Sequence, residues 1–341
     1  MIGFRKVLYY CFWLAEILFG LLIAVCITFT ISVKPGVYII RHMFNQPVII
    51  LDKTTFNKAS SKVNKFKDIS YPSRYKNNKM DIYYPKSANK ARGILIWVHG
   101  GGFVAGDKYA IEEFATYIVA NNQIAVVAIN YETAPELVFP GQVIQLNEAY
   151  NFLKQYHSCF ISVDFSKVLF GGDSAGGQIA GQYTALQTNK HYADELSIRQ
   201  AIPSENIQAF IAYSAPLNLQ QMSEARSRSL FMKFFVNTVA RAVIGTWKWK
   251  NDIKLKQASV AEYLSPQFPP SFITDGNTYS FQEQGQLFEK KLNDLNVTTQ
   301  SLFYADSHKA IPHEYQFNYA TEEAKNCLHN TIKFIEEQLI D

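Results

Sequence analysis

The chain has 341 residues, enough to bury a large core, and α/β domains of more than 200 residues often fold as one unit. Hydrophobic residues make up 48% of the sequence and charged residues 18%, a composition that excludes a largely disordered chain. The formal net charge is only +4 and no long run of lysine or arginine occurs, which argues against a nucleic-acid partner.

The four cysteines are spread along the chain. Cys11 and Cys26 lie in an apolar N-terminal run, whereas Cys159 and Cys327 stand alone in the remainder. The sequence contains no Cys-x-x-Cys pair and no Cys/His cluster with the spacing of metal ligands. It therefore predicts neither a disulfide framework nor a metal site, and pairing of Cys159 with Cys327 stays open as an alternative to two free thiols.

The N-terminal residues 7–33 form an apolar run in which Glu16 is the only side chain expected to carry charge. About 20 apolar residues suffice for a helix to span a bilayer. A secretory signal has a shorter apolar core and a small-residue cleavage site, and no convincing site lies near Ser32. We predict an uncleaved transmembrane anchor at residues 1–33, with a cleaved signal peptide or a buried core helix as the alternatives.

The orientation of this anchor follows less directly from the flanking charges. Arg5 and Lys6 precede the apolar run, and Lys34 and Arg41 follow it closely, so the number of basic residues does not set the orientation. A short basic N-terminus usually stays in the cytoplasm. This predicts a single-pass membrane protein whose following domain lies outside the cytoplasm.

After a predicted linker or loosely packed arm at residues 34–64, strand and helix signals alternate. Apolar runs typical of strands occur at 80–85, 94–98, 124–131, 168–170, 206–216, 271–276 and 298–305. Helical patterns occur at 148–156, after the fourth of these runs as far as about Leu186, and at 322–339. This alternation predicts one α/β domain over residues 65–341, with a mostly parallel sheet and helices on both faces.

Residues 216–265 interrupt the alternation because they contain no clear strand signal. Within them, the apolar run Leu230–Ile244 predicts a helix, placed as an inserted cap over the edge of the sheet would be. Its aromatic and methionine side chains suit a pocket for an apolar group. Ordinary packing of a helix against the sheet explains the same pattern equally well.

The pentapeptide Gly172–Gly176 fits the pattern G-x-S-x-G, with Ser174 at its centre. It follows a buried strand signal and precedes a helical pattern, the context in which such a serine occupies a strained turn that exposes its hydroxyl. Small neighbours are needed because the backbone bends tightly there, and the N-terminus of the following helix favours developing negative charge. Ser174 is therefore the candidate nucleophile.

A second glycine motif, HGGGF at His99–Phe103, directly follows another buried strand signal. Consecutive glycines allow backbone N–H groups to point into a cleft, where they can stabilise the oxyanion of a tetrahedral intermediate. The amides of Gly101, Gly102 and Ala175 are the candidate donors. His99 is expected to shape this loop.

With "HGGGF" and "GDSAGG", and with "NYETAPELVFP" at 130–140 and "VDFSKVLF" at 163–170, the sequence resembles the hormone-sensitive-lipase group of α/β-hydrolases, the HGGG carboxylesterases. The resemblance covers roughly Asp68 to Leu339. It implies an α/β-hydrolase fold with an eight-stranded sheet and a helical cap, and hydrolysis of carboxylic esters without a metal or an organic cofactor. A membrane span is not part of the general pattern of that group.

The catalytic base of such an enzyme is expected late in the chain, after the last strand. His313, in the segment "IPHEYQF", lies there and matches the histidine-plus-aromatic segment of the family. His308, in "ADSHKA", is the alternative. We take His313 as the candidate base.

The acid that orients the histidine is where the sequence departs from the family. The resemblance implies an aspartate in a G-x-x-D turn after the penultimate strand, and counting from Gly276 places Tyr279 at that position. Tyrosine supplies no carboxylate, although its hydroxyl can accept a hydrogen bond from the histidine. Three nearby carboxylates are possible replacements, with the first preferred and no replacement at all as the remaining alternative: Asp275, Glu283 and Asp306.

Two functions of different classes are compatible with these residues. The first is a membrane-anchored serine hydrolase that cleaves small-molecule or lipid-like esters of short or medium acyl chain through an acyl-enzyme intermediate. The second is a binding or adhesion protein on a hydrolase scaffold whose catalysis is weakened by Tyr279, because a fold does not by itself determine a function.

Overall fold

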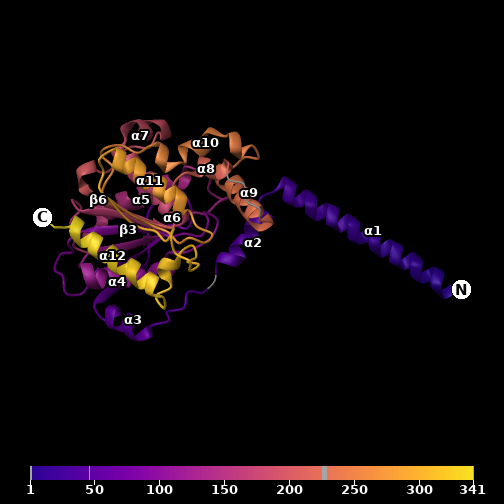
Figure 1. The fold of residues 1–341 in the computed structure, drawn as a ribbon, viewed down its shortest axis with the longest axis horizontal. Coiled ribbons are helices and arrows are strands. Elements are labelled where there is room, and N and C mark those ends of the chain that lie inside the picture. Colours follow the sequence, from indigo (N-terminus) through magenta and orange to yellow (C-terminus); the bar gives the residue numbers. More distant parts are fainter. Residues whose placement is uncertain (1, 46, 225–228, 341) are drawn as a thin grey trace.

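A computed structural model describes residues 2–45, 47–224 and 229–340 of the chain (Figure 1). A long helix, α1 (Ile2–Ile31), projects away from the α/β domain that the rest of the chain forms. The undescribed residues fall in four predicted segments. They are residue 1 of the anchor, residue 46 of the linker or arm, residues 225–228 of the cap and residue 341 at the end of the domain.

The domain is built on one eight-stranded sheet with the order β1-β2-β4-β3-β5-β6-β7-β8. The strands are β1 (Val63–Ser70), β2 (Lys79–Pro85), β3 (Ile94–Val98), β4 (Ala125–Ile129), β5 (Val168–Asp173), β6 (Ile207–Tyr213), β7 (Ser271–Thr274) and β8 (Thr299–Leu302). Only the pairs β1–β2 and β2–β4 are antiparallel, and the other neighbours run parallel. The predicted mostly parallel, eight-stranded sheet is confirmed.

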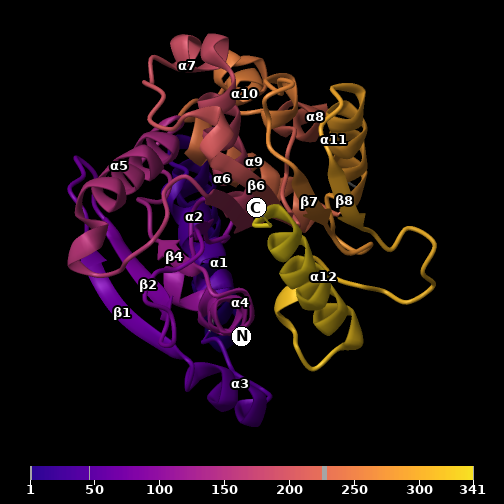
Figure 2. The same ribbon diagram turned by 90° about the vertical axis from the view of Figure 1, so that its left-hand side faces the viewer.

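Helices cover both faces of the sheet (Figure 2). Alternate residues of β3 separate the two cores: Ile96 packs in the cluster that includes residues of α5 (Gly141–Tyr156) and α6 (Ala175–Thr188). Trp97 packs in the cluster that includes residues of α4 (Glu112–Asn122) and α12 (Glu322–Gln338). Both faces of the central strands are therefore buried, which explains why their sequences are continuously apolar.

The first strand, β1, was not predicted. It forms the edge of the sheet, and its side chains alternate irregularly between buried and exposed. A bulge interrupts its pairing with β2 between Phe66 and Ile69, where Asp68 has a φ of 57°. Because a half-exposed, bulged strand needs few apolar residues, its sequence carries no clear strand signal.

Residues 34–45 and 47–64, predicted as a linker or a loosely packed arm, include regular secondary structure. They contain α2 (Lys34–Phe44) and α3 (Lys53–Ser60) and end at the start of β1. α2 buries Gly36, Val37 and Ile40, and a Cβ added to Gly36 would lie only 2.8 Å from the side chain of Thr238. α2 has only 11 residues and carries apolar side chains on its exposed face as well as on its buried face, so its helical period is not clear in the sequence.

The cap lies between β6 and β7 and is helical in its described part. It comprises α8 (Leu219–Glu224), α9 (Leu230–Ile244) and α10 (Ile253–Gln257). Elsewhere, α7 (Lys190–Leu196) follows α6, and α11 (Gln282–Asp294) connects β7 to β8. The side of α9 nearest the sheet is buried, and α9 ends at Gly245, whose φ of 83° forms a left-handed C-cap.

α1 is long and apolar enough to cross a membrane over Gly3–Ile31, and none of its most apolar stretch is buried in the domain. Its C-terminal end contacts α9. The rings of Phe29 and Phe234 lie 6.5 Å apart, and the guanidinium of Arg241 donates to the carbonyl oxygens of Phe29 and Thr30, each at 3.4 Å.

Candidate active site

Ser174 occupies the sharp turn between β5 and α6. Its φ of 48° and ψ of −121° are strained for a residue with a side chain, and its amide donates to the carbonyl of Tyr213 at 2.8 Å. The glycines on either side permit this turn. A Cβ on Gly176 would lie 2.1 Å from the carbonyl oxygen of Val98, and a Cβ on Gly172 would lie 2.5 Å from the backbone of Gly176.

The HGGGF loop borders the same cavity as Ser174. Gly101 and Gly102 have φ values of 110° and 60°, which side chains rarely adopt, and both line the cavity together with Ala175. The carbonyl of Gly101 accepts from the amides of Val104 and Ala105, which closes the turn. The three residues predicted to supply the oxyanion donors, Gly101, Gly102 and Ala175, therefore line the same cavity as Ser174.

The imidazole of His99 supports this loop from beneath and takes no part in the cavity. It is buried, its Nδ1 lies 2.7 Å from the carbonyl oxygen of Gly100, and its ring stacks on Tyr131 with centroids 4.6 Å apart. Burial lowers the pKa of His99, so the ring is neutral. This is the shaping role expected for His99.

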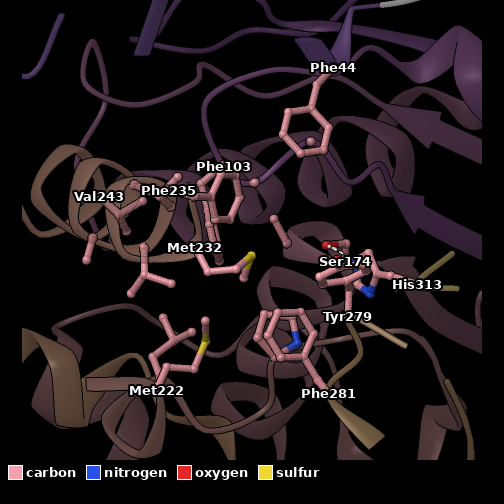
Figure 3. Close-up of a pocket in the computed structure, with 18 of the residues that line it drawn as sticks. Phe44, Phe103, Ser174, Met222, Met232, Phe235, Val243, Tyr279, Phe281 and His313 are labelled. Carbon is pink, nitrogen blue, oxygen red and sulfur yellow. Dashed lines mark hydrogen bonds between the residues drawn. The ribbon is translucent and has the colours of Figure 1, made fainter. Parts of the chain in front are cut away.

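The structure brings His313 to Ser174 (Figure 3): Nε2 of His313 lies 3.0 Å from Oγ of Ser174. The loop after β8 that carries His313 is held against the loop after β7, because the amide of His313 donates to the carbonyl of Thr278 at 3.0 Å. The ring of Phe281 packs edge-on against the imidazole, with centroids 5.3 Å apart. His308, the alternative base, is exposed in the loop before it.

Asp275 lies on the other side of the imidazole. Its Oδ1 is 3.7 Å from Nδ1 of His313, within the range of an ion pair but beyond that of a hydrogen bond. The carboxylate is buried and accepts three hydrogen bonds, from Oγ of Ser214 and the amide of Gly276 at 2.7 Å each, and from the amide of Phe281 at 2.6 Å. These three donors fix the position of the carboxylate.

The other residues considered for the acid lie elsewhere. The side chain of Tyr279 is 78% exposed at the rim of the cavity, and its φ is 53°. Glu283 and Asp306 are exposed. Within the described part of the chain, Asp275 is the carboxylate recorded in an ion pair with His313, and Nδ1 of His313 has no hydrogen-bond partner.

The electrostatic surroundings of His313 favour its protonated form. Burial opposes the charge, but the carboxyl groups of Asp275, Glu314 and Asp173 outweigh it and raise the pKa of His313 above its ordinary value. The charged imidazolium form of His313 is therefore stabilised at this position.

Asp173 supports the glycine loop, a role that the sequence did not predict. The residue is buried, Nε1 of Trp97 donates to its Oδ1, and the amide of Gly100 donates to its Oδ2, each at 2.7 Å. Burial, and then the neighbouring carboxyl of Glu314, raise the pKa of Asp173 to about 8. The position of Asp173 beside the serine was the only available signal, and nothing in the sequence indicated that Glu314 lies close enough to raise its pKa.

A cavity of about 500 Å³ extends from Ser174 and His313 beneath the cap. Its walls are mostly apolar, as the labelled side chains in Figure 3 illustrate, and α9 supplies many of them. The lining side chains from α9 include Phe231, Met232, Phe235, Val236, Val239 and Val243. α9 therefore packs on the domain and also lines a pocket suited to an apolar group.

The eight-stranded sheet, the strained serine turn after β5 and the histidine after β8 define an α/β-hydrolase. Residues 80–292 match the model of the BD-FAE family, and the chain belongs to that family.

Individual relatives are more distant. A protein of Acanthamoeba polyphaga mimivirus that carries the name of an α/β-hydrolase is 24% identical over 233 residues, which are 67% of this chain and 63% of the relative. The Arabidopsis thaliana protein named "Probable carboxylesterase 6" is 31% identical over 117 residues, 30% of this chain and 34% of the relative. The alignments thus span less than two thirds of these curated relatives.

Among solved structures, esterase B from Lactobacillus rhamnosis superposes with a TM-score of 0.72 at 17% identity, over 90% of this chain and 96% of the esterase. At this identity the likeness concerns the fold.

Proposed function

We propose that this protein is a serine hydrolase that cleaves carboxylic esters through an acyl-enzyme intermediate. The observation that carries the proposal is the 3.0 Å contact between Nε2 of His313 and Oγ of Ser174, beside the HGGG loop and at the end of an apolar cavity. The resemblance to HGGG carboxylesterases and the esterase fold of the solved relative support the ester as substrate.

In the proposed reaction, Oγ of Ser174 attacks the ester carbonyl while His313 accepts its proton. The amides of Gly101, Gly102 and Ala175 stabilise the oxyanion, and the N-terminus of α6 adds a favourable dipole. His313 then returns the proton to the alcohol leaving group, and water hydrolyses the acyl-enzyme by the same steps. The cavity of about 500 Å³ accommodates a short or medium acyl chain.

Asp275 is proposed as the acid. At 3.7 Å from Nδ1 it stabilises the imidazolium by charge, and a small movement of the loop that carries His313 would bring the two atoms into a hydrogen bond. In this arrangement the acid precedes the glycine of the family's turn, and the residue at the family's own position, Tyr279, is free to form part of the cavity rim.

The second candidate function is binding without efficient catalysis. It is favoured by the absence of a hydrogen-bond partner on Nδ1 of His313 within the described structure. Without such a partner the imidazole is less firmly held in the tautomer that accepts the serine proton.

A fluorophosphonate probe distinguishes the two functions, because it labels only an activated serine. We expect the full-length protein to be labelled and to hydrolyse p-nitrophenyl butyrate, and Ser174→Ala to do neither. Absence of both labelling and hydrolysis in the wild-type protein would leave binding as the function.

We further propose that residues 1–33 form an uncleaved membrane anchor and that the α/β domain lies outside the cytoplasm. The contacts of Phe29 and Thr30 with α9 support retention of the helix, because cleavage after residue 32 would remove them from the folded protein. The test is fractionation followed by protease protection on intact cells. A mature protein that begins after Ser32 would refute the anchor, and a domain protected from external protease would refute the orientation.

A further inference from the structure

Helices α2 and α9 lie where α1 leaves the domain (Figure 1), and both carry exposed apolar side chains. The close packing of the two helices is shown by the contact of Gly36 with Thr238. We call their apolar surface the α2/α9 face, defined by exposed apolar side chains on these two helices: Tyr38, Ile39, Met43, Phe44, Leu230 and Phe231. Leu230 is the most exposed of them, at 80%, and a group of exposed apolar side chains on neighbouring helices is typical of a protein or membrane interaction site.

The chain path places this face at the end of the proposed anchor. Only Ser32 and Val33 separate the end of α1 from the start of α2, and they span at most about 7 Å. α1 itself is about 45 Å long, enough to cross the hydrocarbon core of a bilayer. When α1 crosses the membrane, α2 therefore begins at the membrane surface.

The polar residues at this junction have the chemistry of a membrane interface. Trp247 is exposed, and the guanidinium of Arg241 lies 3.2 Å from the centre of its ring. Tryptophan is enriched at the level of the lipid headgroups, and arginine binds their phosphates. Arg241 also binds the end of α1, so the aromatic ring, the cation and the anchor occupy one level.

The α2/α9 face is continuous with the cavity that holds Ser174. Phe44 and Phe231 are exposed on this face and also line the cavity. Between them lies Phe235, whose ring centroid is 5.8 Å from that of Phe44 and 6.3 Å from that of Phe231. An apolar path therefore leads from the outer surface of α2 and α9 to the candidate nucleophile.

We propose that the α2/α9 face rests in the outer layer of the bilayer and that the cavity takes its substrate from there: a lipid-like ester whose acyl chain is dissolved in the membrane. This inference rests on the proposed ester hydrolysis and on the anchor. It names the route and the substrate class: the acyl chain passes between Phe44 and Phe231 without entering water. The bilayer is favoured over a protein partner because α1, if it spans the membrane, keeps α2 within two residues of the lipid.

The test uses the full-length protein reconstituted in phosphatidylcholine vesicles, with two substrates. The water-soluble ester is p-nitrophenyl acetate, and the membrane ester is didecanoylglycerol carried in the vesicles, whose acyl chains are of medium length. The double variant Ile39→Gln/Leu230→Gln removes apolar surface from the α2/α9 face without touching the cavity lining. Leu287→Gln is the matched control, because Leu287 is an exposed leucine on α11.

We expect the double variant to hydrolyse the membrane ester about tenfold more slowly than the wild-type protein, because two apolar side chains no longer enter the bilayer. Its rate on p-nitrophenyl acetate should be unchanged, and Leu287→Gln should match the wild-type protein on both esters. Equal rates of the double variant and the control on the membrane ester would overturn this inference. Absence of hydrolysis of both esters by the wild-type protein would instead overturn the proposed function.

Discussion

The two sides of the candidate site are constrained in different ways. On the side of the nucleophile, Gly172 and Gly176 have no room for a Cβ, so the tight turn around Ser174 requires glycine at both positions. On the side of the acid, Asp275 is held by three hydrogen bonds yet stops 3.7 Å from His313. Where a side chain cannot fit, glycine is required, and the glycines appear as a motif in the sequence. A carboxylate can reach a histidine from several places in the chain, so the position of the acid leaves no such motif.

The largest effect is expected on the nucleophile side. Ser174→Ala and His313→Ala should each reduce kcat for p-nitrophenyl butyrate by about 10⁶-fold, and the double variant should lose no more, because the two groups act as one unit. Steady-state kinetics with purified proteins measures this. A further loss in the double variant would show that the two side chains act independently.

Removing the charge of the proposed acid is expected to reduce kcat less than removing the nucleophile, but still by a large factor. Asp275→Asn keeps the shape of the side chain and removes its charge, and should reduce kcat by up to about 10⁴-fold. The rate of p-nitrophenyl butyrate hydrolysis measures the loss.

The matched controls are Tyr279→Phe and Glu283→Gln, which should stay within about twofold of the wild-type protein because both side chains are exposed to solvent. A large loss in Tyr279→Phe, with little change in Asp275→Asn, would transfer the role of the acid to the tyrosine hydroxyl.

The backbone constraint can be tested separately from the chemistry. Gly176→Ala would place a Cβ 2.1 Å from the carbonyl oxygen of Val98, and we expect the free energy of unfolding to fall by about 2 kcal/mol or more. Gly20→Ala in α1, where nothing lies within 4 Å of an added Cβ, should leave it unchanged. Thermal unfolding in detergent measures both, and an equal Tm for the two variants would contradict the steric argument.

The smallest effect concerns pH. The base must be neutral to accept the serine proton, and neighbouring carboxyl groups raise the pKa of His313. The acidic limb of kcat/KM should therefore lie at a higher pH than for an ordinary histidine, and activity should rise as pH increases through it.

Removing the charge in Asp275→Asn takes away a group that raises this pKa, so the limb of the residual activity should move to lower pH. The profile of kcat/KM between pH 4 and 9 measures the shift, and an unmoved limb would mean that Asp275 does not interact with His313.

Sequence and tertiary structure contributed different parts of this description. Strands buried on both faces must be apolar throughout, and tight turns require residues without a Cβ, so β3, β4, β5 and the two glycine motifs were visible in the sequence. The edge strand β1 was not, because a half-exposed strand needs few apolar residues, and helix α2 was not, because its 11 residues carry apolar side chains on the exposed face as well as on the buried one. The contact of Asp275 with His313, the electrostatic effect of Glu314 on Asp173 and the arrangement of α2 and α9 around the cavity depend on segments that are distant in the sequence, and only the folded chain decides them.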